Sequence, residues 1–530
     1  MNEPIIFLYG PSGSGKSTAG EILAKNLDIP FVDLDKTIVQ KSGQSIPEIF
    51  QAGGEAGFRA LELQILQQAV QGPSGVIALG GGALLNPEAR KVAETHGQIY
   101  LLTAETDLLF QRLKADPQER PLLNGGGFQR LEKLINLRSE HYQSFAVQID
   151  TGRLDPAETA WQIQILAGRF RIHVPGSKGR PGQEAYDVLV QSGGLQQTGD
   201  LITRRGLRGP ILVISDDQVG PLYAEQVVSS ITNAGYTCRT LFFGAGEKNK
   251  RMETMSELWD ACLSAGLERA STILGLGGGV VTDMAGFAAA TYLRGIRWVS
   301  LPTSLLGMVD ASLGGKTGID LERGKNLVGS FHSPALVLAD PNVLSTLPIS
   351  EIRSGLAETI KHGVIADPIL YADCEHLDLE HIPESLIRRA ISVKARVVEM
   401  DPFEQNRRAA LNLGHTIGHA VEQASDFSLR HGDAVAIGMV VETLLAERLG
   451  LAEKGLSEKL ILTLSLKGLP THIPPELDPK KILNALLLDK KKTSGKVKFA
   501  LPVKIGEVIT GIEVDEERIN HAIGAGVTRS

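Results

Sequence analysis

A glycine-rich loop near the start of the chain constrains the fold more than any other feature. The apolar run from Ile5 to Tyr9 is typical of a buried strand, and it leads directly into GPSGSGKST, residues 10–18. A loop of this kind lies between a strand and a helix, where its backbone N–H groups converge on phosphate oxygens. Lys16 adds a positive charge and Ser17 a hydroxyl for Mg2+. The pattern predicts phosphoryl transfer, and a plain turn of glycine and serine is the alternative.

The length of the chain and its hydrophobic pattern predict several domains. Its 530 residues exceed what one hydrophobic core usually supports, which favours about three domains. Apolar runs alternate with amphipathic segments through residues 1–168, as in a βαβ fold. The segment HVPGSKGRPGQ, residues 173–183, is rich in Gly, Pro and basic residues, and we place a linker at 169–183. A second α/β region follows at 184–340, and helical periodicity dominates 341–530. The predicted fold class is α/β, with a P-loop kinase domain around a parallel sheet, then a Rossmann-like α/β domain and a mainly α-helical domain.

Composition and charge exclude several classes of protein. With 42% hydrophobic and 22% charged residues, the chain has the proportions of an ordinary globular protein. A net charge of −7 provides no broad positive field, so we expect small anionic ligands and no nucleic acid. Cys238, Cys262 and Cys374 are widely spaced with no C-x-x-C motif, so neither a disulfide framework nor a thiolate metal site is indicated. Because the sequence has neither a basic leader nor a long apolar stretch, we expect a cytoplasmic protein with no membrane partner.

Carboxylates and basic residues follow the phosphate loop within the first region. In FVDLD, we expect Asp33 and Asp35 on one face of a strand end, because side chains alternate along a strand. One carboxylate suits Mg2+ through water and the other a substrate hydroxyl, and a solvated strand end is the alternative. Guanidinium groups bind carboxylates and phosphoryl groups, and glycines let a ligand approach the backbone. The residues of these types are Arg59 in GEAGFR, Gly80 to Gly82 in GGGA, Arg120 in RPLL and Arg138 in LRSEHY.

Together these motifs resemble shikimate kinase over the whole first region. The resemblance implies ATP-dependent phosphorylation of shikimate to shikimate 3-phosphate, with Lys16, Asp35 and Arg120 as catalytic residues and Arg120 on a closing lid. It implies that Ser17 and Asp33 hold Mg2+. The implied ATP-binding residues are Gly13, Ser14, Gly15, Lys16, Ser17, Thr18 and Arg120. The implied shikimate-binding residues are Asp35, Arg59, Gly81, Gly82 and Arg138.

A second glycine-rich segment indicates different chemistry. Gly277 to Gly279 in ILGLGGGVVTDM follow a predicted strand and precede a helix of small residues that we expect to start near Asp283. The pyrophosphate of a dinucleotide suits such a helix start, but the spacing is not G-x-G-x-x-G, and close packing of helix against sheet is the alternative. A ligand site is also favoured by the polar residues that crowd the next Gly-rich stretch. They are Asp310, Lys316, Lys325 and Asn326.

Histidines in the third region predict a metal site. NLGHTIGHAVE places His415 and His419 four residues apart on one helical face, and HGDAVAIGM adds His431. Spacing alone favours His415 with His419 as a ligand pair, and structural histidines held by hydrogen bonds are the alternative. Glu358 in GLAETIKHG offers a carboxylate. One Glu and two His leave zinc open positions for substrate oxygens.

From about residue 172 to the end, the sequence resembles 3-dehydroquinate synthase. The resemblance assigns zinc, or Co2+ in its place, to Glu358, His415 and His431, and it puts His419 beside the substrate instead of the metal. The implied catalytic residues are Lys316, Glu358, Lys361 and His419. The implied NAD-binding residues are Asp216, Glu247, Lys248, Gly278, Gly279, Asp283, Thr303, Ser304, Lys316, Lys325 and Thr346. The implied substrate-binding residues are Arg294, Asp310, Lys316, Asn326, Lys361, Lys394, Arg408, Asn412 and His419.

The reaction implied by this second resemblance converts 3-deoxy-arabino-heptulosonate 7-phosphate into 3-dehydroquinate and phosphate. In the family, NAD+ transiently oxidises a secondary alcohol so that phosphate can leave, and the hydride then returns. Three positions leave alternatives open. Asp433 stands where the family usually has the glutamate of HGE, Asp217 directly follows Asp216, and either Lys491 or Lys498 is the tail lysine that reaches the substrate.

The sequence as a whole predicts a bifunctional enzyme of aromatic biosynthesis. Its expected cofactors are NAD, zinc, and Mg2+ with ATP, and its expected partners are small-molecule substrates. The family tendency implies a homodimer through the synthase portion. Two alternatives remain open: a kinase fused to a zinc- and NAD-dependent polyol dehydrogenase of the glycerol dehydrogenase type, or a chain in which one module is non-catalytic and serves nucleotide sensing or assembly.

Overall fold

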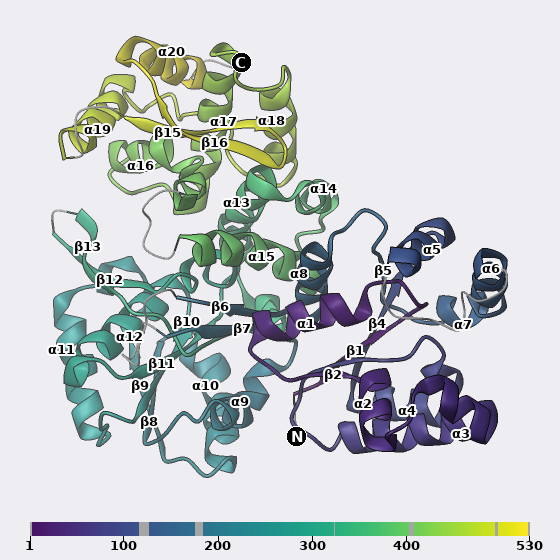
Figure 1. Ribbon diagram of the computed structural model, residues 1–530. Coiled ribbons are helices and arrows are strands. Elements are labelled where there is room, and N and C mark those ends of the chain that lie inside the picture. Colours follow the sequence, from purple (N-terminus) through teal and green to yellow (C-terminus); the bar gives the residue numbers. More distant parts are fainter. Residues whose placement is uncertain are drawn as a thin grey trace. The chain divides into compact units, whose positions relative to one another are not determined.

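The chain divides into two compact units, Met1–Ala167 and Gly168–Ser530 (Figure 1). The structure is a computed structural model, and it describes residues 3–115, 127–174, 184–322, 324–401, 407–492 and 497–527. Each unit has its own sheet and its own hydrophobic cores. The two units are therefore described separately.

The first unit is built on a parallel five-stranded sheet with strand order β2-β3-β1-β4-β5. The strands are β1 (Ile5–Tyr9), β2 (Phe31–Asp33), β3 (Val76–Ala78), β4 (Gly97–Thr103) and β5 (Gln148–Asp150). All five residues of β1 are buried, because this apolar strand lies in the middle of the sheet. The predicted buried strand and the predicted parallel sheet are both confirmed.

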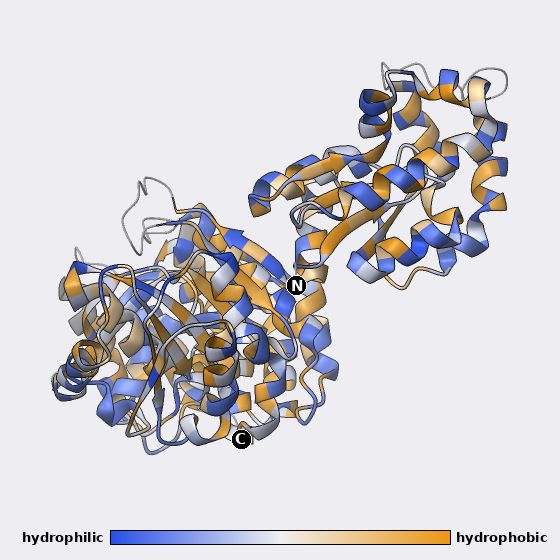
Figure 2. Cartoon of the chain, turned by 90° about the horizontal axis from the view of Figure 1, so that it is seen from below, coloured by the Kyte–Doolittle hydropathy of each residue, from blue (hydrophilic) through white to orange (hydrophobic). Residues whose placement is uncertain are grey.

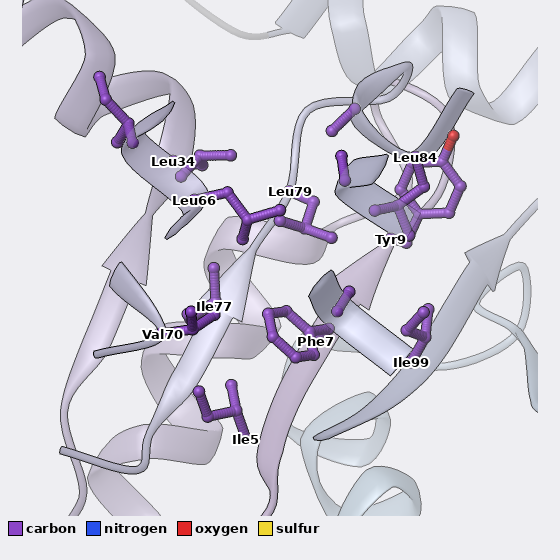
Figure 3. Packing of buried hydrophobic residues seen from close by; sticks show 14 of the residues in the cluster. Ile5, Phe7, Tyr9, Leu34, Leu66, Val70, Ile77, Leu79, Leu84 and Ile99 are labelled. Carbon is purple, nitrogen blue, oxygen red and sulfur yellow. The ribbon is translucent and has the colours of Figure 1, made fainter. Parts of the chain in front are cut away.

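Helices cover both faces of this sheet. They are α1 (Lys16–Leu27), α2 (Leu34–Ser42), α3 (Ile46–Ala69), α4 (Pro87–His96), α5 (Thr106–Ala115), α6 (Gly127–Leu137), α7 (Ser139–Gln143) and α8 (Pro156–Ala167). Since side chains alternate along β1, Phe7 and Tyr9 pack into one core, shown in Figure 3, while Ile6 and Leu8 pack into the other. The strand that precedes the phosphate loop is thus anchored on both sides.

The second unit begins with a mainly parallel sheet of seven strands, in the order β6-β7-β14-β11-β10-β8-β9. The strands are β6 (Arg169–Ile172), β7 (Tyr186–Val190), β8 (Ile211–Asp216), β9 (Cys238–Phe243), β10 (Thr272–Gly277), β11 (Arg297–Pro302) and β14 (Leu336–Ala339). The helices here are α9 (Thr198–Arg204), α10 (Gly220–Asn233), α11 (Met252–Ser264) and α12 (Gly279–Thr291). A separate hairpin is formed by β12 (Lys316–Leu321) and β13 (Gly324–Phe331).

Two local expectations in this region were wrong. Residues 169–172, placed in the linker, form the edge strand β6, which pairs antiparallel with β7. The alternation of Phe170 and Ile172, both buried, with two arginines is a strand pattern. The helix expected near Asp283 begins four residues earlier, at Gly279, directly after the strand. The start of the linker was misplaced because basic residues alternate with the apolar ones of β6. The start of α12 was misplaced because glycines lie at its start.

The remainder of the second unit is mainly helical, as predicted. Its helices are α13 (Ile349–Ala366), α14 (Pro368–His376), α15 (Glu384–Met400), α16 (His415–Ala424), α17 (His431–Arg448), α18 (Leu456–Leu466), α19 (Pro479–Lys492) and α20 (Glu516–Val527). A hairpin of β15 (Lys498–Lys504) and β16 (Glu507–Glu513), which the sequence did not indicate, packs among them. From Gly432 to Ala446 only Asp433 of α17 is not buried, so this helix runs through the interior. It is the central support of the helical region.

The surfaces of the helices follow the usual amphipathic pattern. Apolar and hydrophilic stripes alternate along most helices in Figure 2. No helix of the described ranges is long and apolar enough to cross a membrane. Cys238, Cys262 and Cys374 are free thiols, and the last two are buried.

Candidate active sites

The phosphate loop of the first unit has the backbone geometry that an anion site requires. Gly10, Gly13 and Gly15 all have positive φ, and a Cβ on Gly10 would lie only 2.1 Å from the backbone oxygen of Leu102. Gly15 is the N-cap of α1, so the first N–H groups of this helix face the loop. Lys16 Nζ bends back and donates to the carbonyls of Gly10 at 2.8 Å and Pro11 at 2.9 Å. The loop is ready to receive phosphate oxygens.

Two carboxylates lie beside the loop, although not in the way we expected. Ser17 Oγ donates to Asp33 Oδ2 at 2.7 Å, which joins the two groups expected to hold Mg2+. Asp33 is the N-cap of α2, where it also accepts the Lys36 N–H at 3.1 Å. Asp35 therefore lies in the first turn of a helix and not on a strand end, which corrects the period-two argument. A strand-end reading missed the capping role of Asp33.

The kinase residues meet around one cavity of about 1480 Å³. It is lined by the phosphate loop and by residues from α2, α3, α6 and the glycine loop after β3. The predicted site residues in its wall are Gly13, Ser14, Gly15, Lys16, Ser17, Thr18, Asp33, Asp35, Arg59, Gly81, Gly82 and Arg138. Arg120 lies outside the described residues. The cavity thus collects every other predicted kinase residue.

Two residues outside the predicted set, Glu62 and Tyr142, contribute to the contacts around Arg59 and Arg138 in this cavity. Glu62 is buried and binds Arg59 Nη1 at 2.6 Å, and burial raises the pKa of its carboxyl. The carbonyl of Gly81 accepts from Tyr142 Oη at 2.7 Å and from Arg138 Nη1 at 2.9 Å. The only signal for Glu62 was its place one helical turn after Arg59. Both arginines are held in place by neighbours before any ligand arrives.

In the second unit, the glycine segment after β10 ends at the start of α12. Gly278 is the N-cap of this helix, so unpaired N–H groups point out of its first turn. A Cβ on Gly277 would lie 2.5 Å from the Val281 side chain, so close packing also requires a glycine there. Thr303 N–H donates to Gly277 O at 2.9 Å, which places Thr303 and Ser304 beside the segment. Both readings of the motif, ligand contact and close packing, are compatible with this geometry.

A buried lysine that we had not singled out lies beside this segment. Lys250 Nζ donates to Asp283 Oδ2 at 2.6 Å and to Asn326 Oδ1 at 2.5 Å, and it lies 3.9 Å from Glu247 Oε1. Lys248, in contrast, is exposed. Burial lowers the pKa of Lys250, but Asp283 and Glu247 outweigh it and the net shift is upward. The last lysine of GEKNK is therefore the one built into the site.

The remaining predicted NAD positions differ in their surroundings. Asp216 Oδ1 accepts the N–H of Val219 at 2.8 Å, and Asp217 Oδ1 accepts the N–H of Ala245 at 2.9 Å, so both carboxylates already serve the backbone. The Thr346 hydroxyl contacts Tyr223 Oη at 2.5 Å. Lys325 Nζ reaches Glu422 Oε1 at 3.2 Å. These contacts leave the choice between Asp216 and Asp217 open.

Three of the predicted substrate residues are buried cations, whereas Arg294, Lys316, Asn326, Asn412 and His419 are exposed. Lys361, Lys394 and Arg408 are at most 6% exposed. Lys394 Nζ lies 2.6 Å from Asp310 Oδ1, and burial lowers the pKa of Lys394 to about 8 despite this carboxylate. Arg294 and Asn326 both have positive φ, which is uncommon for residues other than glycine and often marks functional positions. Asn412 ends a short 3-10 helix, Arg407–Asn412, and Lys316 begins β12.

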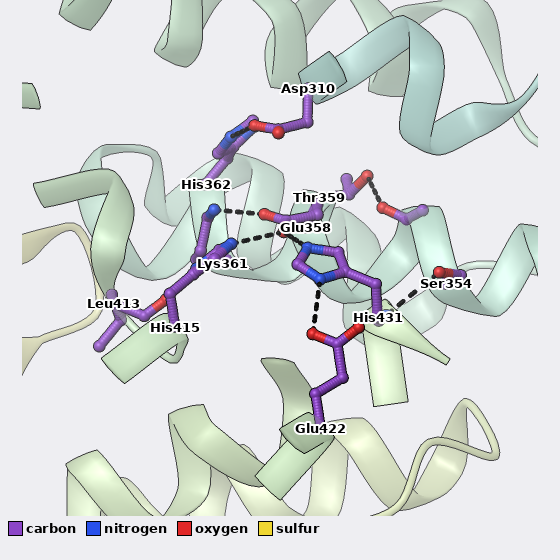
Figure 4. A network of polar contacts seen from close by, with 12 residues as sticks. Asp310, Ser354, Glu358, Thr359, Lys361, His362, Leu413, His415, Glu422 and His431 are labelled. Carbon is purple, nitrogen blue, oxygen red and sulfur yellow. Dashed lines mark hydrogen bonds and ion pairs between the residues drawn. The ribbon is translucent and has the colours of Figure 1, made fainter. Parts of the chain in front are cut away.

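Glu358, His415 and His431 converge from three different helices (Figure 4). Glu358 Oε1 lies 3.3 Å from His415 Nε2 and 3.2 Å from His431 Nε2, and the ligand atoms all lie within 4.8 Å of one another. Lys361 Nζ contacts the other oxygen of Glu358. Burial alone would raise the pKa of Glu358, but Lys361 and the histidines hold it well below its usual range. The metal ligands named by the resemblance are therefore in one place.

The donor set fits a divalent cation. A buried carboxylate with two imidazole nitrogens is a typical catalytic zinc environment, and it leaves coordination positions for substrate. Burial lowers the pKa of His415, which favours the neutral form that binds metals. The pKa of His431 shifts in the opposite direction. Burial lowers this pKa, but Glu358 and Glu422 outweigh burial and raise it to about 9. Two carboxylates, those of Glu358 and Glu422, thus flank His431 at the point where a metal cation is expected.

His419 lies next to this group but outside it. Its ring centroid is 5.1 Å from that of His415 and 6.0 Å from that of His431, and burial lowers its pKa to about 4. The pair of His415 with His419, favoured by spacing alone, is not the group that surrounds Glu358. Glu422, which we did not predict, is 3.6 Å from His431 Nδ1, and its place one turn after His419 was the available signal. A carboxylate behind a ligand histidine orients its ring.

The tail positions are less informative. Asp433 is half-buried in the first turn of α17, where burial raises its pKa and Arg430 and Arg353 oppose the shift. Lys498 is exposed and begins β15. The side chain of Lys491 lies outside the described residues. The choice between the two lysines stays open.

The first unit is an α/β fold with a phosphate loop, and the second combines a mainly parallel sheet with a Glu-His-His group. These features define an enzyme with one nucleotide-binding part and one metal-binding part. Comparison with known proteins identifies both parts. Residues 240–354 and 355–492 match the families described as 3-dehydroquinate synthase N-terminal and C-terminal, and residues 12–166 match the family described as shikimate kinase. The chain belongs to the 3-dehydroquinate synthase family and carries a shikimate kinase domain before it.

Individual relatives agree with this assignment. A 3-dehydroquinate synthase of Synechocystis is 43% identical over 351 residues, which cover 64% of this chain and 97% of that protein. One of Pelobacter propionicus is 44% identical over 336 residues, covering 62% and 93%. A solved structure of ValA (2-epi-5-epi-valiolone synthase) from Streptomyces hygroscopicus, with NAD+ and Zn2+ bound, has a TM-score of 0.59 and 31% identity, covering 64% of this chain and 96% of that one. The similarity spans the second unit.

Proposed function

We propose that the chain catalyses two reactions of aromatic biosynthesis at two separate sites. The first unit phosphorylates shikimate with ATP to give shikimate 3-phosphate. The second unit converts 3-deoxy-arabino-heptulosonate 7-phosphate into 3-dehydroquinate and phosphate, using NAD and zinc. The observation that carries the second assignment is the convergence of Glu358, His415 and His431 within 4.8 Å, next to buried cations.

The kinase proposal follows from the charges around the cavity. Lys16 and the loop N–H groups neutralise the phosphates of ATP, and the pair of Ser17 and Asp33 suits its Mg2+. Arg59 and Arg138, fixed by Glu62 and Gly81, present guanidinium groups to the shikimate carboxylate. Asp35 is then left to align the hydroxyl that attacks the phosphoryl group. The residues position the reactants and stabilise charge, which is the main demand of phosphoryl transfer.

In the second unit, this chain's residues bind a flexible dianionic substrate in one pose. Bound NAD would supply reversible oxidation of an alcohol, and a bound metal would polarise the substrate oxygens. Lys361, Lys394 and Arg408 neutralise the phosphate and the carboxylate. His419, neutral because burial lowers its pKa, is available to accept a proton. Lys250 holds Asp283 and Asn326 together beside the glycine segment, where we place the dinucleotide.

A polyol dehydrogenase does not account for these residues as well. A simple polyol has no charge, whereas Lys361, Lys394 and Arg408 bring three cations together in one buried region, which suits an anionic substrate. The alternative in which one module is non-catalytic is also disfavoured. The predicted metal ligands converge in the second unit, and the described phosphate-loop residues converge on the cavity of the first. Phosphate release without net formation of NADH would support the synthase, and accumulation of NADH with a simple polyol would support the dehydrogenase.

The experiment that tests both assignments uses the full-length protein with each substrate, before and after removal of the tightly bound metal. After stripping with a zinc-selective chelator and addition of Mg2+, we expect synthase activity to fall by at least about a hundredfold. Zn2+ or Co2+ should restore it, and kinase activity should not change. Full synthase activity in metal-free protein would contradict the proposed metal role, and absence of either activity in the untreated protein would favour a non-catalytic module.

We further infer a cytoplasmic homodimer formed through the synthase unit. The family resemblance supports the dimer, and the free thiols of Cys238, Cys262 and Cys374 fit the reducing environment of the cytoplasm. Light scattering on the full-length protein and on a variant lacking residues 1–167 measures the first point. Both proteins should have twice the mass of one chain, and a monomer in either case would contradict the inference.

A further inference from the structure

A buried carboxylate from α17 lies at the N-terminus of α16. Glu442 is fully buried, and its Oε2 accepts the N–H of Gly414 at 2.6 Å while its Oε1 accepts the N–H of Ile417 at 3.0 Å. Burial raises the pKa of Glu442 to about 8, and the N–H groups of Ile417, Gly414 and Thr416 oppose this shift. These backbone groups are the ones a helix leaves without partners at its start. Glu442 therefore acts as the cap of a helix to which it does not belong.

The helix needs this outside cap because of its own sequence. Its N-cap residue is Gly414, with φ 78°, which has no side chain to accept the first N–H groups. Gly414 is also required by packing, since a Cβ there would lie 2.8 Å from the Val435 oxygen. Likewise, a Cβ on Gly438 would lie 1.9 Å from the Gly414 oxygen. The close approach of α16 and α17 excludes a local cap and leaves the task to Glu442.

The position of this cap matters for the metal group. His415 is the first residue of α16, directly after Gly414 and two residues before Ile417. His431 is the first residue of α17, the helix that carries Glu442. The carboxylate of Glu442 thus connects the backbone around one ligand histidine to the helix that carries the other. Its two hydrogen bonds hold the start of α16 against the middle of α17, eleven residues after His431.

We infer that Glu442 is a positioning residue for the Glu358, His415 and His431 metal group, acting through the start of α16. Its carboxylate contacts backbone N–H groups of α16 and does not belong to the group of ligand atoms itself. The inference rests on the proposed function of that group as a zinc site. With the cap lost, the backbone around His415 has an extra degree of freedom, and its imidazole no longer returns to the geometry that the metal requires.

The same helix provides a matched control. Glu447, five residues along α17, accepts the Ser457 N–H at 2.9 Å and the Ser457 hydroxyl at 2.6 Å. It thereby caps α18, whose own N-cap is again a glycine with positive φ, Gly455. None of the predicted site residues lies on α18. Glu447→Gln therefore removes the same kind of cap, from the same helix, at a helix start that is remote from the metal group.

The test compares metal binding by full-length wild-type, Glu442→Gln and Glu447→Gln proteins. In glutamine one oxygen is replaced by an NH2 group, so one helix N–H faces a donor instead of an acceptor. Titration of the stripped proteins with Co2+, followed by its visible absorption, and zinc competition with a chelator give affinity and ligand geometry without any substrate. For Glu442→Gln we expect about tenfold weaker binding and an altered Co2+ spectrum. For Glu447→Gln we expect the affinity and the spectrum of the wild type.

Each outcome decides a different point. If the wild type binds no Co2+ at one site per chain, the proposed function of the metal group fails. If it binds but Glu442→Gln has the same affinity and spectrum, the inference about Glu442 is overturned. If both variants lose affinity equally, the effect is general destabilisation and the inference is again overturned. Should Glu442→Gln fail to fold, Glu442→Asp replaces it. The shorter carboxylate keeps both acceptor oxygens but draws the start of α16 toward α17. An unchanged Co2+ spectrum in Glu442→Asp would overturn the inference.

Discussion

The two units assemble their sites in opposite ways. In the first unit, the groups that receive phosphate come from one short run of sequence, from Gly10 to Thr18. In the second unit, the metal group comes from α13, α16 and α17, and Glu358 and His431 are 73 residues apart. The phosphate-binding part of the first site is a property of a local loop, and the metal group is a property of how helices pack.

This difference determines what each site depends on. The phosphate loop is held by its own backbone, since Lys16 donates to the carbonyls of Gly10 and Pro11. The metal group depends on the contact of α16 with α17, where Gly438 permits the close approach and Glu442 binds the start of α16. A site built from packing is therefore sensitive to residues that no motif names, whereas a loop site is sensitive mainly to its own residues.

The largest effects should come from removing one central group in each unit. Lys16→Met should lower kinase activity by about a hundredfold or more, because a preorganised positive charge is lost from the phosphates. His415→Ala should lower synthase activity to a similar degree, because a metal ligand is lost. Both activities are measured on each full-length variant.

The comparison requires that each of these variants keep the other activity within about twofold of the wild type. The two units have separate cores, so a substitution in one leaves the other folded. A variant that loses both activities would show that the two sites depend on one another, and the contrast between the units would no longer hold.

A smaller effect should separate the two lysines of GEKNK. Lys250→Met leaves Asp283 next to an uncharged side chain at a largely buried position, and we expect a loss of roughly 3 kcal/mol in stability. Lys248→Met changes an exposed side chain and should alter stability by less than about 0.5 kcal/mol. Thermal unfolding with and without NAD measures both. Because Lys250 faces the proposed NAD region, its variant should also lose the stabilisation that NAD gives the wild type.

The opposite result would change the site description. If Lys248→Met weakened NAD binding and Lys250→Met did not, the dinucleotide would contact the exposed side of the GEKNK segment. The buried lysine would then have only a structural role, and the second unit would depend on local sequence more than its geometry indicates.

The sequence predicted the parts of the fold that follow from local patterns. The buried strand before the phosphate loop, the parallel sheets and the mainly helical third region were expected from periodicity and are present. It did not predict that Asp35 lies in a helix, because Asp33 caps that helix and a period-two pattern cannot distinguish a cap from a strand residue. The edge strand β6 was likewise hidden in a segment that was interpreted as a linker because of its neighbours.

The predictability of the two sites differs in the same way. Ser17 and Asp33 meet as expected, since both belong to motifs at the carboxyl ends of strands in one parallel sheet. Residues that act by supporting others were missed, namely Glu62, Lys250, Glu422 and Glu442. Each is a charged residue whose partner lies on another turn or another element, and a charged residue is ordinarily expected to face solvent. Only the tertiary structure distinguishes a buried support from a surface charge.

The smallest effect concerns the pH dependence of the second unit. Lys394 is a base, so it carries its positive charge below its pKa, which burial lowers to about 8. The catalytic efficiency of the synthase should therefore fall as the pH rises above about 8, by up to tenfold for each pH unit, because the neutral amine no longer attracts the anionic substrate. In Lys394→Arg the guanidinium stays charged, and this alkaline fall should be absent up to about pH 10. The measurement is kcat/KM for the heptulosonate phosphate between pH 6 and pH 10, with kinase activity recorded alongside to detect loss of folded protein. An equal fall in Lys394→Arg would assign the pH dependence to another group and would remove Lys394 from the anion-binding set.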